Sequence, residues 1–359
     1  MGTIGNQKCD TTAAGTGGLK TSLLACPLPE ESLKLAYGNT MSQSNLLEIV
    51  RRPFSPDTTL EVPASRLEYD QVQYILETEE QKYPRLLYDG VRNVAIIKAA
   101  PSALHGQMAE SLVSHLSNAA NSAIGATSIS GRLQSSSAET NTQDTGRGRT
   151  TREWDTALYF QEGRHATLMI AVEVAVSQSH TSLQRAISWS ICALKCRLGL
   201  TMAITESRRR SAFGTMSFAS LMEAESAIAE YETNFESQLS SYPYGPLERD
   251  GVDWFGKVRR VLLHTYRWPV EDCPPDTVLA PCQEITLVAD GAYVGNDVSE
   301  NLRDMVLGDC VPTHLVQSRQ IEQIPLNFFR RGWFEEEFQG AMVRTALNRV
   351  RRAVVISTP

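Results

Sequence analysis

The sequence contains no apolar run long enough to cross a bilayer. A transmembrane helix needs roughly 20 predominantly apolar residues, and no stretch of the 359 residues approaches that length. The N-terminal segment, MGTIGNQKCDTTAAGTGGLK, lacks the order of basic and then apolar residues that is typical of a secretory signal. We therefore expect no membrane partner and an intracellular location, nuclear or cytoplasmic.

Cysteine is scarce, and its spacing suggests no zinc site. The seven cysteines are scattered and odd in number, which, without a secretory signal, favours reduced thiols. Cys192 and Cys196 lie one helical turn apart, but no second Cys or His pair at zinc-like spacing accompanies them. We therefore expect both to act as small buried hydrophobic residues.

The chain also lacks an excess of basic residues. Its net charge of -7 argues against a protein that coats nucleic acid by bulk electrostatics. Two local stretches, GRGRTTR and ESRRRS, are nevertheless basic, and each has a second interpretation as a solvated loop. If nucleic acid is the partner, we expect phosphate contacts from the arginines of these stretches, which are Arg147, Arg149, Arg152, Arg208, Arg209 and Arg210.

The composition, 42% hydrophobic and 21% charged, is that of an ordinary globular protein. Residues 1–62, rich in Gly, Thr, Ser and Pro, predict a mobile or peripheral arm. Residues 63–210 read as helix, hairpin, helix, strand, strand, helix and strand, which predicts an α/β core with a mixed central sheet flanked by helices. Within it, the polar residues 125–151 predict a flexible loop. Residues 211–359 are expected to form a C-terminal extension that packs on the core.

The most informative feature is a carboxylate inside an apolar strand. The run LMIAVEVAV, from Leu168 to Val176, predicts a central strand covered on both faces. A buried ionised side chain is costly unless something pairs with it or coordinates it. Strand alternation places Glu173 between Ala171 and Ala175 on one face, which leaves room for an ion, a water or a substrate. The competing interpretation is a strand-end glutamate held by an arginine.

A second carboxylate precedes this strand. The residues EWDTALYF predict a strand from Glu153 to Phe160, with Asp155 on its less apolar face. An antiparallel hairpin through a turn near Gly163 would bring Asp155 within reach of Glu173, with one bulge absorbing the mismatch in spacing. Two facing carboxylates repel, and a hard divalent cation such as Mg²⁺ or Mn²⁺ relieves the repulsion. The alternative is two surface acids on an open sheet face.

This arrangement resembles the PD-(D/E)XK restriction-endonuclease-like superfamily. Asp155, then Glu173-Val174-Ala175 on the next strand, then a helix crossing back, follow the family's motif. The stretch RLLYDGVRNVAIIKAAPSALHGQMAESLVSHL resembles the N-terminal part of Uma2-like nucleases, and VEVAVSQSHTSLQRAISWSI resembles fungal members. The resemblance covers roughly residues 84–206, and its motifs are short and degenerate.

The resemblance implies a site and also a departure from the family. Asp155 and Glu173 would bind the metal, helped by the backbone carbonyl of Ala175. A lysine normally stands two residues after the glutamate, where Ala175 lies in this chain. Gln178 or Arg185 would then orient the attacking water, although neither can deprotonate it.

A histidine opens the helix that the resemblance places first in the core. His105 lies in the first turn of this helix and is a candidate to assist at the site, and packing or capping is its alternative role. Glu110 on the same helix ranks below it, because 100° per residue places it about 140° around the axis from His105.

Two functions of different classes follow from these residues. The first is a metal-dependent phosphodiester hydrolase acting on DNA or RNA through Asp155 and Glu173. The second is a catalytically inactive member of the same fold that serves as a binding or scaffold protein, which the missing lysine and the acidic net charge favour. A third possibility, an unrelated α/β enzyme using Cys192 or His105, lacks a visible nucleophile and base pair.

Overall fold

The computed structural model describes residues 46–80, 82–137, 140–144, 149–176, 180–207, 214–269, 273–295, 305–316 and 319–356. Residues 46–359 form one compact unit, and it is described by itself below. Its class is mixed α/β, with a mixed multi-stranded sheet flanked by helices, as the sequence predicts.

Seven strands form the large sheet in the order β15-β14-β13-β9-β8-β7-β4. Their bounds are β4 Arg132–Ser137, β7 Thr156–Glu162, β8 His165–Val176, β9 Leu198–Glu206, β13 Val258–Arg267, β14 Gln283–Ala289 and β15 Ala292–Tyr293. The neighbours β8 and β9 run parallel, and the other neighbouring pairs are antiparallel. The parallel pair needs a crossover helix, and α5 (His180–Leu194) supplies it.

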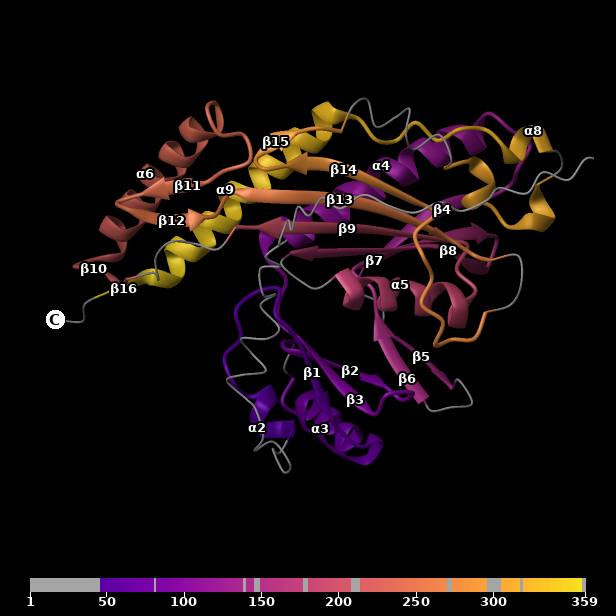
Figure 1. Ribbon diagram of the computed structural model, residues 1–359, viewed down its shortest axis with the longest axis horizontal. Coiled ribbons are helices and arrows are strands. Elements are labelled where there is room, and N and C mark those ends of the chain that lie inside the picture. Colours follow the sequence, from indigo (N-terminus) through magenta and orange to yellow (C-terminus); the bar gives the residue numbers. More distant parts are fainter. Residues whose placement is uncertain are drawn as a thin grey trace, which may run out of the picture. The chain divides into compact units, whose positions relative to one another are not determined.

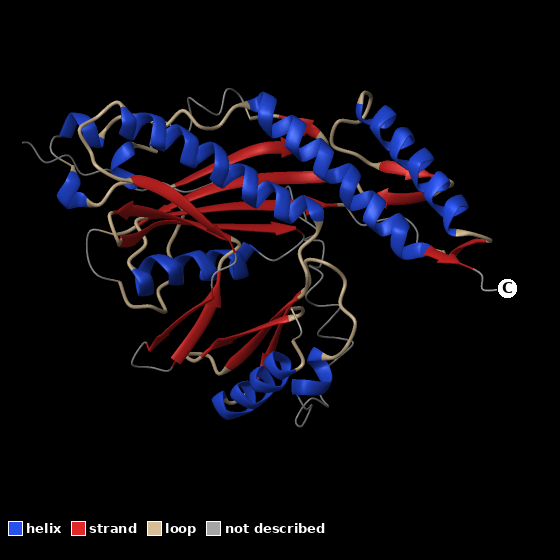
Figure 2. Cartoon of the chain, turned by 180° about the vertical axis from the view of Figure 1, so that it is seen from behind, coloured by secondary structure: helices blue, strands red, loops and turns tan. Residues whose placement is uncertain are grey.

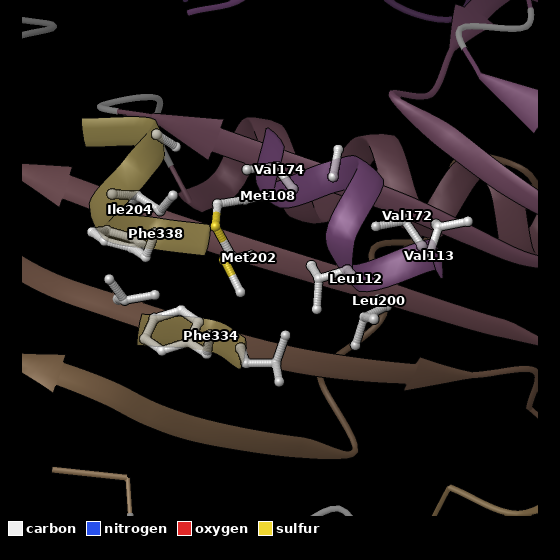
Figure 3. Packing of buried hydrophobic residues seen from close by; sticks show 14 of the residues in the cluster. Met108, Leu112, Val113, Val172, Val174, Leu200, Met202, Ile204, Phe334 and Phe338 are labelled. Carbon is white, nitrogen blue, oxygen red and sulfur yellow. The ribbon is translucent and has the colours of Figure 1, made fainter. Parts of the chain in front are cut away.

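Helices cover both faces of this sheet (Figures 1 and 2). On one face lie α4 (Ala103–Gly125) and α9 (Arg331–Ala353), and Figure 3 shows Met108 of α4 and Phe338 of α9 in the same core as Val174 of β8. On the other face, Ile187 and Ile191 of α5 form a core cluster with Ala171 of β8. Strand alternation therefore places Glu173 on the α5 face.

Two local sequence signals position these helices. Ser102 caps α4, since its hydroxyl accepts a hydrogen bond from the backbone N–H of His105. Gly199 allows α5 to approach β9 closely, because a Cβ at this position would lie only 2.3 Å from Cγ1 of Ile187.

A second, smaller sheet contains the N-terminal strands in the order β1-β3-β2-β6-β5. Its strands are β1 Thr59–Pro63, β2 Arg85–Asp89, β3 Val94–Lys98, β5 Thr140–Asp144 and β6 Arg149–Glu153. The predicted hairpin around Asp89-Gly90 is confirmed as the β2–β3 pair. Two helices, α2 (Leu46–Val50) and α3 (Arg66–Thr78), pack with this sheet in a core of their own.

Residues 46–62, which the sequence assigns to the N-terminal arm, belong to this smaller core. Leu46, Ile49 and Val50 are buried, and β1 pairs with β3 along its whole length. The pattern is not visible in the sequence because each element is short and the loop between them is polar.

The prediction of a flexible loop over residues 125–151 is wrong for the part of this segment that the structure describes. It contributes β4 to the large sheet and β5 and β6 to the small one. β4 and β5 are edge strands made largely of Ser, Thr, Asn and Gln, and most of their side chains are exposed. They therefore lack the apolar alternation by which strands are recognised in a sequence.

The C-terminal extension continues the core. β13, β14 and β15 add strands to the large sheet beside β9, and α9 packs against α4. The remaining elements are β10 Met216–Phe218, α6 Leu221–Leu239, β11 Leu247–Arg249, β12 Val252–Phe255, η1 Leu307–Asp309, η2 Thr313–Leu315, α8 Arg319–Glu322 and β16 Val354–Ile356. None of the described helices combines the length and apolar character that a membrane span requires.

The expectation of reduced thiols is corrected at one pair. Cys192 of α5 and Cys273 form a disulfide across a sequence separation of 81 residues, with their Cα atoms 5.4 Å apart. Cys196 is a free, buried thiol within hydrogen-bond distance of the carbonyl oxygens of Met169 and Leu198. Disulfides are typical of oxidising compartments, so this bond counts against the intracellular location, which stays a prediction.

Candidate functional site

The β7–β8 hairpin brings the two predicted carboxylates together. Its register pairs Thr156 with Val172, and a bulge lies between Leu158 and Tyr159, so the predicted hairpin and its bulge are confirmed. Continuing the register by one residue places Asp155 opposite Glu173. The backbone N–H of Val174 donates a hydrogen bond of 2.7 Å to Oδ2 of Asp155, which fixes this carboxylate beside β8.

His105 lies between two aspartates at the start of α4. Its Nε2 is 2.9 Å from Oδ2 of Asp155, and its Nδ1 is 3.2 Å from Oδ1 of Asp57. The backbone N–H of Ser102 donates to the same oxygen of Asp57 at 2.7 Å. The predicted participation of His105 is therefore consistent with the geometry, whereas Asp57 has no signal in the sequence beyond its place in a turn.

Asp155 and His105 form a buried ion pair. Burial alone would raise the pKa of Asp155, but the positive charges of His105 and Lys98 and the hydrogen bond from His105 outweigh it and lower the pKa to about 2. Burial alone would lower the pKa of His105, but attraction to Asp155 and Asp57 outweighs it and raises the pKa to about 10. Both groups are therefore charged at neutral pH.

Glu173 is buried, with 3% of its surface exposed, and it faces a lysine from the other sheet. Nζ of Lys98, the last residue of β3, lies 3.5 Å from Oε2 of Glu173 and 3.4 Å from the carbonyl oxygen of Glu153. Burial, opposed by Lys98 and reinforced by repulsion from Asp155, raises the pKa of Glu173 to about 7. This is the only lysine ion pair to either carboxylate among the described residues.

Sequence reasoning misses Lys98 because the residue lies far from the motif. The only local signal is a lysine that ends an apolar strand, VAIIK. Its proximity to Glu173 depends on a contact between the end of β3 in the small sheet and β8 in the large one. Ala175, on the Glu173 face at the position where the family resemblance would place a lysine, is buried and small.

The backbone that faces Asp155 belongs to Val174 rather than to Ala175. In an extended strand the N–H and C=O of one residue point toward the same neighbouring strand. Because the Val174 N–H points to Asp155, the Val174 carbonyl lies on that side, and the backbone of Ala175 faces β9, where its partner is Ala203. We therefore move the candidate metal-binding carbonyl from Ala175 to Val174.

No described contact places Gln178 or Arg185, the two residues predicted to replace the lysine, beside the carboxylates. Gln178 lies outside the described residues. Arg185 of α5 is half-buried, and its charge acts on Glu61 of β1. The pKa of Glu61 is lowered first by its hydrogen bond with Arg92, and Arg185 adds a weaker lowering.

The predicted phosphate-contacting arginines are only partly described. Arg147 and Arg208, Arg209 and Arg210 lie outside the described residues, and Arg149 is exposed. Arg152 points inward and pairs with Asp89 at 2.7 Å, so it serves the small sheet rather than an outside ligand.

A pocket of about 600 Å³ opens onto Asp155, His105 and Lys98. Its walls come from α4, β4 and the segment before β2, and they include Glu110, the lower-ranked candidate. The other polar wall residues are Tyr83, Arg85, Ser114, Ser117, Asn118, Ser135, Ser137, Glu153 and Thr156. A polar substrate therefore has access to the ion pairs from this side.

The donor set fits a hard divalent cation. Asp155 and Glu173 supply carboxylate oxygens, and the raised pKa of Glu173 reflects in part the crowding of two negative charges, which a cation would relieve. Among the described residues, no group of three or more His, Cys, Asp or Glu side chains is arranged to hold a metal ion. An ion at this site would therefore rely on two carboxylates, the Val174 carbonyl and water.

Comparisons with protein-family models, curated proteins and solved structures found no match to this chain.

Proposed function

We propose that this protein is a metal-dependent phosphodiester hydrolase of the nuclease type, acting on DNA or RNA through Asp155 and Glu173. One observation carries the proposal. The lysine that the PD-(D/E)XK motif requires is absent at Ala175, yet the ammonium group of Lys98 lies 3.5 Å from Glu173. The chain thus has two carboxylates and a lysine at one place, supplied by different elements than in the motif.

The order of elements around the site supports the proposal. An Asp-bearing segment enters β7, β8 carries the glutamate, and α5 crosses back to the parallel strand β9. This is the order on which the resemblance to the restriction-endonuclease-like superfamily rests. α4, which carries His105 in its first turn, follows the β2–β3 hairpin and covers the opposite face.

Asp155, Glu173 and the Val174 carbonyl would hold the cation. Bound there, Mg²⁺ or Mn²⁺ supplies a Lewis acid that activates water and stabilises negative charge on a phosphodiester oxygen. The protein contributes the remaining parts. Lys98 places a positive charge beside Glu173, where an ammonium orients water and stabilises developing negative charge. His105, charged at neutral pH, holds Asp155 in place.

In the overall hydrolysis, an oxygen of water bonds to phosphorus and the bond from phosphorus to the leaving oxygen breaks. The leaving oxygen takes up a proton, and the pocket side of the site offers two proton donors, Lys98 and His105. The pocket is lined by side chains of both charges. We therefore expect a nucleic-acid strand to bind there through local contacts rather than through the overall charge of the protein.

A second function, an inactive binding or scaffold protein of the same fold, is favoured by a different observation. His105 and Lys98 already neutralise the two carboxylates without any metal. In this case the ion pairs stabilise the fold, and a cation would have to displace them.

Cleavage assays separate the two functions. The purified chain is incubated with single- and double-stranded DNA and RNA in Mg²⁺ or Mn²⁺, with excess EDTA as a parallel sample. We expect metal-dependent cleavage that Asp155→Asn abolishes and that the exposed control Asp70→Asn retains. Binding of nucleic acid without cleavage would support the scaffold function instead, and cleavage that persists in Asp155→Asn would contradict the proposed site.

A further inference from the structure

A second cation lies beside Lys98 at the site. Strand β2 pairs with β3 so that Arg85 is in register with Lys98, and register partners place their side chains on the same face of a sheet. Both side chains line the pocket that opens onto Asp155. Both also contact Glu153, since Nζ of Lys98 lies 3.4 Å from its carbonyl oxygen and the Arg85 guanidinium pairs with its carboxylate. Arg85 is therefore a cation of the pocket that has no part in the metal site itself.

Two neighbours fix the Arg85 guanidinium in place. Nη1 pairs with the carboxylate of Glu153, whose side chain is 5% exposed, whereas the Arg85 side chain is 25% exposed. Nη2 donates a hydrogen bond of 3.2 Å to the hydroxyl oxygen of Tyr83. A guanidinium has five N–H donors in a planar fork that matches the oxygens of a phosphate. The contacts of the guanidinium with described residues use two of these donors, so others are left for an anion that enters the pocket.

The ring of Tyr83 lies next to two cations. Cζ of Arg85 is 4.9 Å from the ring centroid, and Nζ of Lys82 is 5.7 Å from it. Tyr83 is half-buried and lines the pocket, and Lys82 is exposed. Proteins bind single strands with aromatic rings beside cations, because a base stacks on the ring while the cations contact the flanking phosphates. Tyr83 therefore has the surroundings of a residue that stacks on a nucleic-acid base.

The walls of the pocket suit an extended strand. Its volume of about 600 Å³ falls within the range of roughly 300–1,000 Å³ that small-ligand sites have. The lining residues of α4 run from His105 to Asn118, which corresponds to about 20 Å along the helix axis. Beyond Glu110, the polar residues of this wall and of the β4 wall are uncharged, and they are Ser114, Ser117, Asn118, Ser135 and Ser137. The pocket is therefore elongated and polar, with room for a short piece of a single strand.

The same features disfavour a duplex. In a duplex each base is stacked inside the helix, and a protein that contacts its face has to unstack it first. A duplex also carries about one negative charge per 1.7 Å of its axis, whereas the charges of the pocket balance. Its cations are Arg85, Lys98 and His105, and its carboxylates are Glu110, Glu153 and Asp155. The pocket therefore offers local contacts to one strand rather than the excess of positive charge that attracts a duplex.

We infer that Tyr83 and Arg85 form a nucleotide subsite beside the proposed metal site, and that the preferred substrate is single-stranded DNA or RNA. Arg85 binds a backbone phosphate, and Tyr83 stacks on a neighbouring base. Glu153 acts through Arg85 and is a positioning residue. The inference rests on the proposed function, because it takes the strand bound in this pocket to be the substrate of the metal site. The subsite selects single strands by the free face of a base, which DNA and RNA share.

The first test measures binding by fluorescence anisotropy in EDTA, with a labelled oligothymidylate, an oligouridylate of the same length and a DNA duplex of that length. We expect both single strands to bind at least about tenfold more tightly than the duplex. Tyr83→Ala should weaken single-strand binding about tenfold, the scale of one base stacked on an aromatic ring, and should leave duplex binding unchanged. Tyr83→Phe keeps the ring and should retain the preference for single strands.

A matched control removes a tyrosine ring outside the pocket. Tyr74 of α3 is 71% exposed, and Tyr74→Ala should bind all three nucleic acids as the wild type does. Tyr83→Leu, which fills the space of the ring without offering a stacking face, gives the same comparison if Tyr83→Ala is poorly folded. Equal affinity of the wild type for single strands and duplex, or single-strand binding that is unchanged by loss of the Tyr83 ring, would overturn the subsite.

The second test assigns the phosphate contact to Arg85 through the salt dependence of single-strand binding. Each phosphate contact adds about 0.7 to the slope of the logarithm of affinity against that of salt concentration. Arg85→Gln should remove this increment, whereas Tyr83→Ala should weaken binding without changing the slope. The double variant Arg85→Gln/Glu153→Gln leaves no buried carboxylate without its partner, and it should show the same change in slope. An unchanged slope in both Arg85 variants would overturn the phosphate contact.

Cleavage rates of the same nucleic acids in Mn²⁺ separate a failure of the subsite from a failure of the hydrolase. We expect single strands to be cleaved faster than the duplex, and Tyr83→Ala to slow their cleavage about tenfold at low substrate concentration. Metal-dependent cleavage that is equally fast on single strands and duplex, in the wild type and in Tyr83→Ala, would remove the subsite and leave the hydrolase in place. Single-strand binding that depends on Tyr83, without cleavage by the wild type, would overturn the hydrolase and leave the subsite to a binding protein.

Discussion

The ammonium nitrogen of Lys98 lies 3.5 Å from the carboxylate of Glu173, although the two residues belong to different sheets. Lys98 ends β3 of the small sheet, and Glu173 lies within β8 of the large one. The contact compensates for a negative charge buried in an apolar strand, and it brings a lysine to the two carboxylates of the proposed site.

Moving the lysine to residue 175, where the family resemblance would place one, tests the role proposed for Lys98. Lys98→Ala should reduce cleavage by at least about 100-fold, the scale of losing one electrostatic group from a hydrolytic site. The double variant Lys98→Ala/Ala175→Lys should regain part of this loss, because residue 175 shares a strand face with Glu173. Single-turnover cleavage rates measure both effects. Full activity of Lys98→Ala would contradict the assignment.

The raised pKa of Glu173 makes its ionisation destabilising. The usual value is 4.5 and the folded value about 7, so the folded state binds the extra proton and the free energy of unfolding falls as pH rises between these values. Glu173→Gln removes the ionisation, and it should stabilise the protein at pH 8 by roughly 1–3 kcal/mol. Urea unfolding at pH 4 and pH 8 measures the difference. A gain that is as large at pH 4 as at pH 8 would contradict this interpretation.

The His105–Asp155 ion pair should stabilise the fold, because in this pair the folded state favours the charged forms. The pKa of His105 is raised from 6.5 to about 10, so its contribution is complete below pH 6.5 and is lost as pH rises through 10. His105→Gln should lower the free energy of unfolding at pH 6 by roughly 3 kcal/mol, because a buried carboxylate loses its partner. The loss should shrink toward pH 10. The exposed control His314→Gln should change stability by less than about 0.5 kcal/mol, and a comparable loss in this control would contradict the prediction.

The Cys192–Cys273 disulfide closes a long loop. Because its two cysteines are 81 positions apart in the sequence, it should stabilise the oxidised protein by roughly 2–4 kcal/mol. Cys273→Ala and dithiothreitol-treated wild type should therefore unfold at the same lower urea concentration. A wild type that is unchanged by dithiothreitol while Cys273→Ala is destabilised would show that the side chain contributes through packing instead.

The sequence predicts those parts of the site that lie on elements adjacent to one another along the chain. Asp155 and Glu173 are joined by a hairpin, and counting residues on each side of its turn is enough to bring them together with one bulge. His105 follows from the helix that Ser102 caps. Local periodicity and turn signals determine both features.

The parts that depend on distant packing could not be predicted. Lys98 reaches Glu173 from the end of β3 in the small sheet, and Asp57 reaches His105 from a loop before β1. The polar strands β4 and β5 have no apolar alternation to identify them, since their outer faces are exposed.

The most direct test is the rate of Mn²⁺-dependent strand cleavage by the wild type and by Glu173→Gln, with the exposed Glu236→Gln on α6 as the matched control. Glutamine keeps the shape of the side chain and removes the charge that binds the cation and pairs with Lys98. We predict cleavage by the wild type and by Glu236→Gln, and a loss of at least about 100-fold in Glu173→Gln. Equal rates in all three proteins, or no cleavage by the wild type, would contradict a hydrolytic site at Glu173.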